Sequence, residues 1–215
     1  MIRFLFFDMG STLADETRAW EARFRAQLEM GEARKKGITE DELLNAVRQA
    51  SRDYRKQYRG ALDDLGIREM APYSHGLETL YPEAKETLEA LRARYPLGLI
   101  ANQGPGLSQR LCAFGIQSCF SVVVSSFDVG IKKPDPAIFR LALDRAGVRA
   151  DEAVMIGDRL DNDIFPAKAL GMKTVWIRQG FGGLQTPKSP AYAPDWTVSS
   201  LPELLAVDFS YCSPN

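Results

Sequence analysis

The stretch Phe4-Leu5-Phe6-Phe7-Asp8-Met9-Gly10-Ser11-Thr12-Leu13 decides the fold. It begins as an apolar run that ends abruptly at a carboxylate, and small polar residues then break the run. A short run this apolar is typical of a strand buried on both faces of a parallel sheet. Because ligands of open α/β sheets bind beyond the carboxyl ends of the strands, Asp8 would lie at the mouth of a site. A lone Asp-x-Gly more simply indicates an Asp that caps the next turn, so the rest of the chain must decide.

Composition and charge are those of an ordinary globular protein. The chain has 215 residues, of which 45% are hydrophobic and 26% charged, and its formal net charge is −1. This length is enough for one full hydrophobic core and a smaller added unit. A charge so close to zero argues against nucleic acid or an anionic membrane as the main partner. No apolar segment approaches the roughly 20 residues that a membrane span needs.

The cysteines and the N-terminus favour a cytoplasmic location. Cys112, Cys119 and Cys212 are an odd number without metal-ligand spacing, so reduced thiols are the simplest interpretation. The apolar run at the N-terminus is too short for a signal peptide, and a charge ends it. We therefore expect a cytoplasmic protein. The sequence indicates no particular oligomeric state.

The segment from Asp15 to about Leu80 has a different character, because charges are dense and no strand-like run occurs. Thr39-Glu40-Asp41-Glu42 is a capping box, and apolar residues follow it at helical spacing. We interpret residues 15–80 as a helical cap domain inserted into an α/β core domain of residues 1–14 and 81–215. The basic residues near this helix predict a solvated face, with a substrate-facing cluster as the alternative: Arg48, Arg52, Arg55, Lys56 and Arg59.

From Tyr81 onward, strand and helix patterns alternate. We expect strands at 97–101, 122–124, 153–156 and 173–177, and a short last one at 196–198. Helices are expected from Pro82 to Arg94 and at 107–114, 136–146 and 162–170, and the stretch 180–194 is expected to be a long surface loop. Such alternation indicates βαβ units. The predicted fold is therefore α/β: a Rossmann-like, mainly parallel sheet with helices on both faces, plus an inserted all-helical cap.

Polar residues fall just beyond several of these strands or at the starts of helices: Asp8, Asn102, Lys133, Asp158 and Asp163. Each alone would be unremarkable, since Asn after a strand is usually a turn former. Together and in this order they form four motifs, at 7–13, 99–102, 132–136 and 156–163. With these motifs the chain resembles the haloacid dehalogenase superfamily, which is dominated by Mg²⁺-dependent phosphatases. The resemblance covers nearly the whole chain, including a cap inserted directly after the first motif.

The resemblance implies a covalent mechanism at a metal site. Asp8 is the candidate nucleophile, because attack by a carboxylate splits one difficult step into two through an ester intermediate. Mg²⁺ takes hard oxygen ligands, and the resemblance implies Asp8, Asp158 and the backbone carbonyl of Gly10 as ligands, with Asp163 binding directly or through water. Lys133 would supply positive charge to the nucleophile and to the transferring group.

The resemblance also implies a small, phosphorylated substrate. The residues assigned to substrate binding are Asn102, Ala101, Ser11 and Thr12. Asp161 is left out of the site, because an exposed turn or cap position explains it better. The only histidine, His75, lies near the return from the cap to the core, and we interpret it as a structural or exposed residue, with a substitute acid–base as the alternative.

Two departures from the family pattern bear on activity. Phosphatases of the family that this chain resembles have Asp-x-Asp in the first motif. Their second Asp protonates the leaving oxygen and later activates water, but here Gly10 takes that place. Ala101 replaces the strand-end Ser or Thr that binds the phosphoryl group, and the Asn102 amide is a partial substitute. General acid–base help contributes typically about 10²–10⁴-fold. Restoring an Asp at position 10 is therefore expected to raise turnover of esters with poor leaving groups.

Three functional hypotheses follow. The first is a hydrolase of a small phosphorylated metabolite, with acid–base help from the cap, the substrate or water. The second is carbon–phosphorus or carbon–halogen cleavage, because those branches also lack the second Asp. The carbon–halogen branch lacks the acidic pair present here, and the carbon–phosphorus branch needs an imine-forming cap lysine, for which Lys35, Lys36 and Lys56 are available. The third is a catalytically weak protein that binds a phosphorylated ligand or a protein partner.

Overall fold

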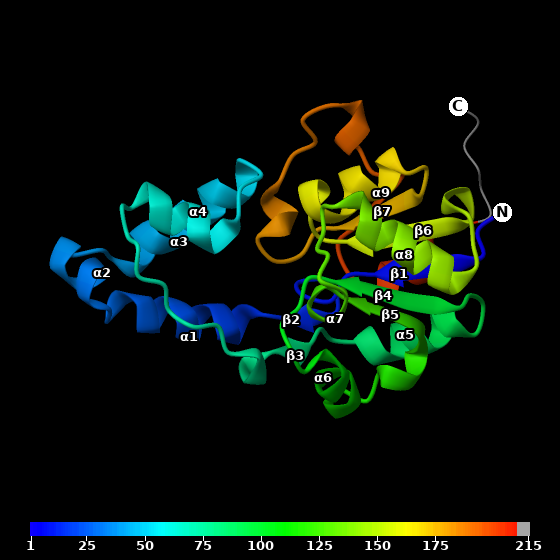
Figure 1. Ribbon diagram of the computed structural model, residues 1–215, viewed down its shortest axis with the longest axis horizontal. Helices are drawn as coiled ribbons and strands as arrows, with labels where there is room; N and C mark the ends of the chain where they lie inside the picture. Colours follow the sequence, from blue (N-terminus) through cyan, green and yellow to red (C-terminus); the bar gives the residue numbers. More distant parts are fainter. Residues whose placement is uncertain (210–215) are drawn as a thin grey trace.

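The computed structural model describes residues 1–209 and contains a parallel sheet of six strands (Figure 1). The strand order is β5-β4-β1-β6-β7-β8, and every neighbouring pair is parallel. The strands are β1 (Phe4–Phe7), β4 (Leu97–Ala101), β5 (Phe120–Ser125), β6 (Ala153–Gly157), β7 (Lys173–Ile177) and β8 (Trp196–Val198). The predicted α/β class is therefore confirmed, and each predicted strand is present.

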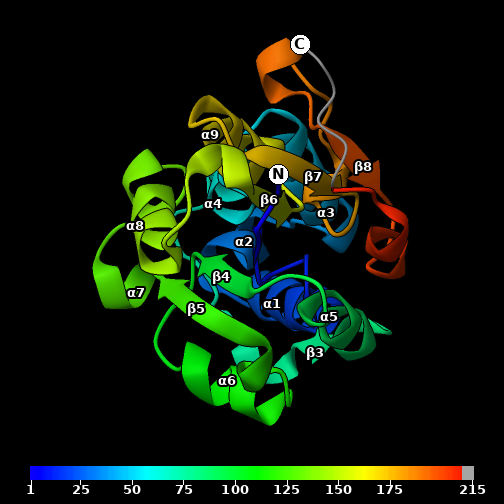
Figure 2. The ribbon, with the colours of Figure 1, turned by 90° about the vertical axis from the view of Figure 1, so that its right-hand side faces the viewer.

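The first strand, β1, is central because both of its faces are apolar. Its residues alternate between two hydrophobic clusters, as a strand with a two-residue period must. Leu5 and Phe7 pack on the face covered by α5 (Ala84–Arg92) and α6 (Leu107–Ala113). Phe4 and Phe6 pack on the face covered by α8 (Pro136–Ala146) and α9 (Phe165–Ala169). Figure 2 shows α8 and α5 on opposite sides of the sheet.

Helix ends of the core follow local capping chemistry. Asp135 accepts a hydrogen bond from the Ala137 amide at 2.8 Å, with Pro136 as the first residue of α8. Two predicted helices differ from the observed ones by more than a single residue. The helix expected from Pro82 begins at Ala84, and the one expected at 162–170 is divided into a π-helical turn, η4 (Leu160–Ile164), followed by α9. The remaining short helices are α7 (Ser126–Val129), η1 (His75–Leu77), η2 (Gln117–Cys119), η3 (Ala150–Glu152), η5 (Gly182–Leu184), η6 (Pro190–Tyr192) and η7 (Pro202–Ala206).

Four helices follow the first motif and form a unit beside the sheet (Figure 1, blue to cyan). They are α1 (Thr17–Leu28), α2 (Gly31–Lys36), α3 (Glu40–Arg52) and α4 (Gln57–Asp64). The unit has a hydrophobic cluster of its own, which includes Phe24, Leu43, Val47 and Leu62. The capping box predicted at Thr39 is present, since its hydroxyl accepts from the Glu42 amide. The division into a 15–80 cap and a core remains a proposal.

The ends of this helical segment are strands, which the sequence analysis did not predict. β2 (Ala14–Asp15) and β3 (Thr79–Leu80) pair antiparallel with each other, not with the main sheet. The all-helical assignment of 15–80 was therefore wrong for Asp15, Thr79 and Leu80. The chain leaves and re-enters the core along adjacent paths, so backbone groups of the two passes satisfy one another.

The stretch expected to be a long surface loop is partly buried. Gln185 is only 3% exposed, and its side-chain amide donates to the Ser51 carbonyl at 3.1 Å. The Ser51 hydroxyl in turn donates to the Phe181 carbonyl at 2.7 Å. Residues 181–185 thus fasten α3 to the core, and we call this segment the docking loop. Polar backbone groups in a buried loop need such partners.

The structure also bears on the expectations about membrane spans and cysteines. No helix within residues 1–209 has both the length and the hydropathy to cross a membrane. Cys112 is an exposed free thiol and Cys119 a buried one, whereas Cys212 lies outside the described residues.

Candidate active site

The site forms where β1 and β6 end side by side. Phe7 is paired with Ile156 in register, and the Asp8 amide donates to the Ile156 carbonyl at 2.9 Å. Asp8 and Asp158, the residues near these two strand ends, therefore emerge at the same edge of the sheet. The π-helical turn η4 adds Asp163, and carboxylate oxygens of the three residues lie within 4.8 Å of one another. The structure thus brings together the three carboxylates that the sequence analysis proposed.

Lys133 reaches the same point from the loop before α8. Its ammonium group lies 2.6 Å from Asp8 Oδ1 and 2.6 Å from Asp163 Oδ1, and its side chain is fully buried. Asn102 holds the Lys133 backbone from both sides: its amide nitrogen donates to the Lys133 carbonyl and its oxygen accepts from the Lys133 amide, each at 2.8 Å. Asn102 therefore positions Lys133, a role that the sequence analysis missed.

The cluster carries more negative than positive charge. When all three carboxylates are ionised, they and the one ammonium group carry a formal net charge of −2. Burial raises the pKa of Asp158 well above its ordinary value, and the neighbouring Asp163 and Asp8 raise it further. Burial by itself would lower the pKa of Lys133, but the two attached carboxylates outweigh burial and raise it. An all-oxygen set with this charge fits one divalent cation such as Mg²⁺.

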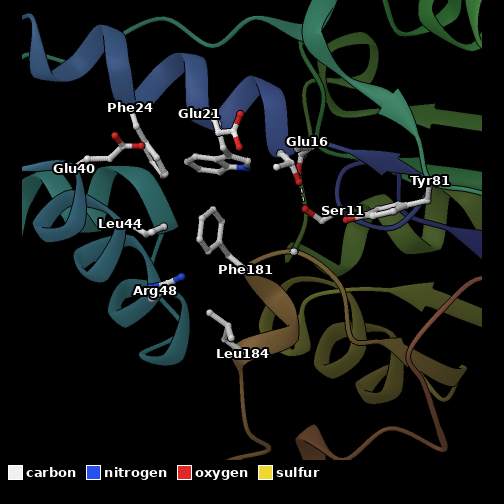
Figure 3. A pocket seen from close by; sticks show the side chains of 13 residues that line it. Ser11, Glu16, Glu21, Phe24, Glu40, Leu44, Arg48, Tyr81, Phe181 and Leu184 are labelled. Carbon is white, nitrogen blue, oxygen red and sulfur yellow. Dashed lines mark hydrogen bonds between the residues drawn. The ribbon is translucent and has the colours of Figure 1, made fainter.

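Two cavities meet above the carboxylates. The first, of about 480 Å³, has Asp8, Asp158 and Lys133 in its wall and reaches Lys56 of the helical unit. The second, of about 420 Å³, lies between the helical unit and the docking loop (Figure 3). Its apolar wall consists of Trp20, Phe24, Leu44, Phe181 and Leu184. Ser11, Glu16 and Trp20 line both cavities.

Gly10 and Glu16 are neighbours at the junction of the two cavities. A Cβ atom added to Gly10 would lie 3.0 Å from Glu16 Oε1 and 3.1 Å from Oε2. The Glu16 carboxylate accepts hydrogen bonds from the Ser11 hydroxyl at 2.7 Å and from the Tyr73 hydroxyl at 2.8 Å. Sequence reasoning missed Glu16. Its only signal was a carboxylate six positions after the glycine that replaces the expected Asp.

The other residues assigned to substrate binding occupy different surroundings. Ser11 lines the first cavity, but its hydroxyl donates a hydrogen bond to the Glu16 carboxylate. Thr12 and Ala101 are fully buried and line neither cavity. His75, interpreted as structural or exposed, also lines neither cavity, and its Nδ1 lies 2.7 Å from Glu78 Oε1.

Strand β7 and the docking loop both contact Asp158. The side-chain nitrogen of Trp176, on β7, donates to the Asp158 carbonyl at 2.6 Å, and Gly182 of the docking loop packs directly against the same residue.

Asp161 was wrongly interpreted as an exposed turn residue. It is half-buried, accepts two hydrogen bonds from Arg159, and accepts a third from the Gln185 amide at 2.9 Å.

Comparison with known proteins agrees with this geometry. The profile of the haloacid dehalogenase-like hydrolases matches residues 5–177, a span that includes all four motifs. The chain belongs to this family. It is 30% identical to the glyceraldehyde 3-phosphate phosphatase of Pyrococcus furiosus, over 96% of this chain and 92% of that protein.

Solved structures of the family have the same architecture. A phosphatase from Thermococcus onnurineus has a TM-score of 0.63 and 26% identity, covering 94% of this chain and 96% of that one. A 2-haloacid dehalogenase from Pseudomonas syringae pv. Tomato has a TM-score of 0.60 and 30% identity, covering 96% of this chain and 99% of that one. The prediction of a haloacid dehalogenase-like hydrolase of the phosphatase type is confirmed.

Proposed function

We propose that this hydrolase is a Mg²⁺-dependent phosphatase that acts on a small phosphorylated metabolite through an aspartyl-phosphate on Asp8. The observation that carries the proposal is the convergence of Asp8, Asp158 and Asp163 at one point in the wall of a cavity, where a buried ammonium group contacts Asp8 and Asp163. The relatedness to a glyceraldehyde 3-phosphate phosphatase along nearly the full chain supports it.

Each residue of the cluster has a chemical task. Asp8 attacks phosphorus, and its carboxylate oxygen forms the new bond to the phosphoryl group. Lys133 orients Asp8 through their 2.6 Å contact and lowers the repulsion between this carboxylate and an anionic substrate. Asp158, Asp163 and Asp8 would hold Mg²⁺, which neutralises negative charge on the phosphoryl group when bound. The Gly10 carbonyl stays a predicted further ligand.

The second cavity would take the alcohol part of the substrate. It adjoins the first cavity, and aromatic and aliphatic side chains supply most of its wall. Figure 3 shows Phe24, Leu44 and Phe181 around the same space. We infer a substrate whose phosphate lies over Asp8 and whose carbon skeleton extends toward Phe181. Because α1, α3 and the docking loop all line this space, the helical unit acts as a cap that selects the substrate.

The proposal is tested by phosphate release with and without Mg²⁺ from 4-nitrophenyl phosphate, glycerol phosphate and glyceraldehyde 3-phosphate. We expect Mg²⁺-dependent release from at least one ester. The Asp8→Asn variant should release none, and its rapidly quenched mixture should lack the phosphoryl adduct that mass spectrometry finds on the wild type. A wild type that releases phosphate from no ester in Mg²⁺ would refute the proposal.

The position of Lys56 favours carbon–phosphorus cleavage as a second candidate function. Carbon–phosphorus cleavage needs an imine-forming cap lysine, and Lys56 at the start of α4 lines the cavity that contains Asp8. Lys35 and Lys36 lie on α2 and do not line it. Borohydride treatment in the presence of a carbonyl-bearing phosphonate tests this function. An adduct on Lys56 together with phosphate release would favour it, whereas the absence of both would leave phosphate-ester hydrolysis.

A further inference from the structure

The carboxylate of Glu16 occupies the space that a side chain at position 10 would enter. The contact distances of 3.0 to 3.1 Å to an added Cβ put both carboxylate oxygens against that position. Gly10 is not among the residues with positive φ, so its backbone conformation does not itself require glycine. The absence of a side chain at Gly10 is therefore what makes room for the Glu16 carboxylate.

Glu16 also lies where the leaving alcohol oxygen would need a proton. It lines the cavity that contains Asp8 and the apolar cavity beside it, and few residues do both. Under the proposed function, the phosphoryl group lies in the first cavity and the alcohol in the second. The oxygen that joins the phosphoryl group to the alcohol would then lie at the junction of the two cavities, next to Glu16.

Two hydrogen bonds hold the Glu16 carboxyl group in one orientation. The hydroxyls of Ser11 and Tyr73 each donate to one of its oxygens. The side chain therefore presents a fixed carboxyl group at the junction of the two cavities, and a general acid or base must be positioned in this way within reach of the proton that it transfers.

We propose that Glu16 is the general acid and base of this site and does the work for which the family uses the second Asp of its first motif. The proposal rests on the phosphatase function proposed above. It assigns a catalytic role to a residue at the start of α1, outside the four sequence motifs.

The proposed reaction has two steps. In the first, an Asp8 oxygen bonds to phosphorus, the bond from phosphorus to the alcohol oxygen breaks, and that oxygen takes the proton of Glu16. In the second, the Glu16 carboxylate takes a proton from water while the water oxygen bonds to phosphorus. The acyl-phosphate bond then breaks, Asp8 regains its carboxylate, inorganic phosphate forms, and Glu16 is protonated again.

The test compares Glu16→Gln with the wild type on two esters that differ in leaving group. 4-Nitrophenolate leaves without a proton, so the variant should still phosphorylate Asp8 and release a burst of nitrophenolate. Its second step lacks a base, so the phosphoenzyme should accumulate and be visible by mass spectrometry. With the poor leaving group of an alkyl phosphate, the first step should slow by about 10²–10⁴-fold and no burst should appear.

Two controls separate chemistry from folding. Glu29→Gln removes an exposed carboxylate from the other end of α1 and should leave both reactions at the wild-type rate. Thermal melting should show that Glu16→Gln is folded, and a Mg²⁺ titration should show that it still binds the metal. If that variant does not fold, Glu16→Asp serves instead, because the shorter side chain keeps a carboxyl group but moves it away from the junction of the two cavities. The same loss of activity on alkyl phosphates is then expected.

The outcomes distinguish this inference from the proposed function. An active wild type whose Glu16→Gln variant hydrolyses alkyl phosphates at an unchanged rate would overturn the role of Glu16 alone. Equal losses on both esters without phosphoenzyme would also overturn it, because they indicate a structural role. A wild type inactive on every ester with Mg²⁺ would overturn the proposed function and, with it, this inference.

Discussion

Gly182 packs so closely on Asp158 that no side chain fits at position 182. A Cβ at Gly182 would overlap the Asp158 carboxylate and lie 2.6 Å from its backbone oxygen. Gly182 belongs to the docking loop, whereas Asp158 follows the β6 strand of the core. The loop that fastens the helical unit therefore also presses on the proposed metal site, which couples cap attachment to the carboxylate cluster.

We predict that Gly182→Ala weakens Mg²⁺ binding. The added methyl group must displace either the loop or the Asp158 side chain, and interiors this close-packed yield little. Calorimetric titration with Mg²⁺ measures the effect. Gly31→Ala is a suitable control, because a Cβ there meets only ordinary contacts of 3.7 Å with Glu69. Equal Mg²⁺ affinity in both variants would contradict the coupling.

We predict that Asp158→Asn weakens Mg²⁺ binding more than the roughly 10–100-fold that loss of an outer partner of a metal site costs. The variant removes one of three converging carboxylates and half of the uncompensated charge. Because ligand binding stabilises the folded state, the Mg²⁺-induced rise in melting temperature should shrink as well. Asp128→Asn, at an exposed position of α7, should keep the wild-type rise. An unchanged Mg²⁺ affinity in Asp158→Asn would refute the assigned ligand set.

We predict that Lys133→Met destabilises the metal-free protein by about 3–5 kcal/mol, the typical cost of removing one partner from a buried ion pair. The lost ammonium group leaves Asp8 and Asp163 facing each other without compensation. Urea unfolding in a chelator gives the free energy of unfolding, and added Mg²⁺ should restore part of it. The adjacent exposed Lys132→Met should change stability little. Equal stabilities of the two variants would contradict the prediction.

We predict a pH-dependent stability difference between Glu16→Gln and the wild type in metal-free solution. Burial raises the pKa of Glu16, against the hydrogen bonds from Ser11 and Tyr73 and together with the charges of Glu78 and Asp15. Between the unfolded and the raised native pKa, the native state binds more protons, so wild-type stability falls as pH rises. The neutral Gln avoids this loss.

The measurement is urea unfolding of both proteins in a chelator at about pH 4 and about pH 8. Taking the difference between the two proteins removes the contributions that the substitution leaves unchanged. The charge of Glu16 also raises the pKa of Asp158, so its loss changes the Asp158 contribution in the same direction. The advantage of Glu16→Gln should be greater at the higher pH. An advantage that shrinks as pH rises would mean that the native pKa of Glu16 is lowered.

The contact between Gly10 and Glu16 leads us to revise the expectation that Gly10→Asp raises turnover. The new side chain would meet the Glu16 carboxylate at 3.0 Å from its first atom and place two negative groups in one space. We predict lower stability and no gain on alkyl phosphates for Gly10→Asp alone. Combined with Glu16→Ala, which clears the space, the same change should recover part of the activity that Glu16→Ala loses. A single Gly10→Asp variant that melts like the wild type and gains activity would contradict this account.

The sequence by itself determined the fold and the members of the carboxylate cluster. An apolar run such as Phe4–Phe7 is typical of a strand buried on both faces, and its regular alternation with amphipathic helices indicates parallel crossovers. Because parallel strands end at one edge, Asp8 and Asp158 had to converge once their strands were adjacent. Lys133 and Asp163 could be placed beside them through the resemblance to the family.

Only the tertiary structure decided which groups complete the site. Asn102 turned out to hold the Lys133 backbone, a contact across 31 residues that no local pattern encodes. The docking loop lies 130 residues from its partner Ser51, and a Gly- and Pro-rich composition indicates a loop but not what packs on it. Glu16 became meaningful only when its carboxylate was found against Gly10, because a missing side chain leaves a space whose occupant is chosen by packing in three dimensions.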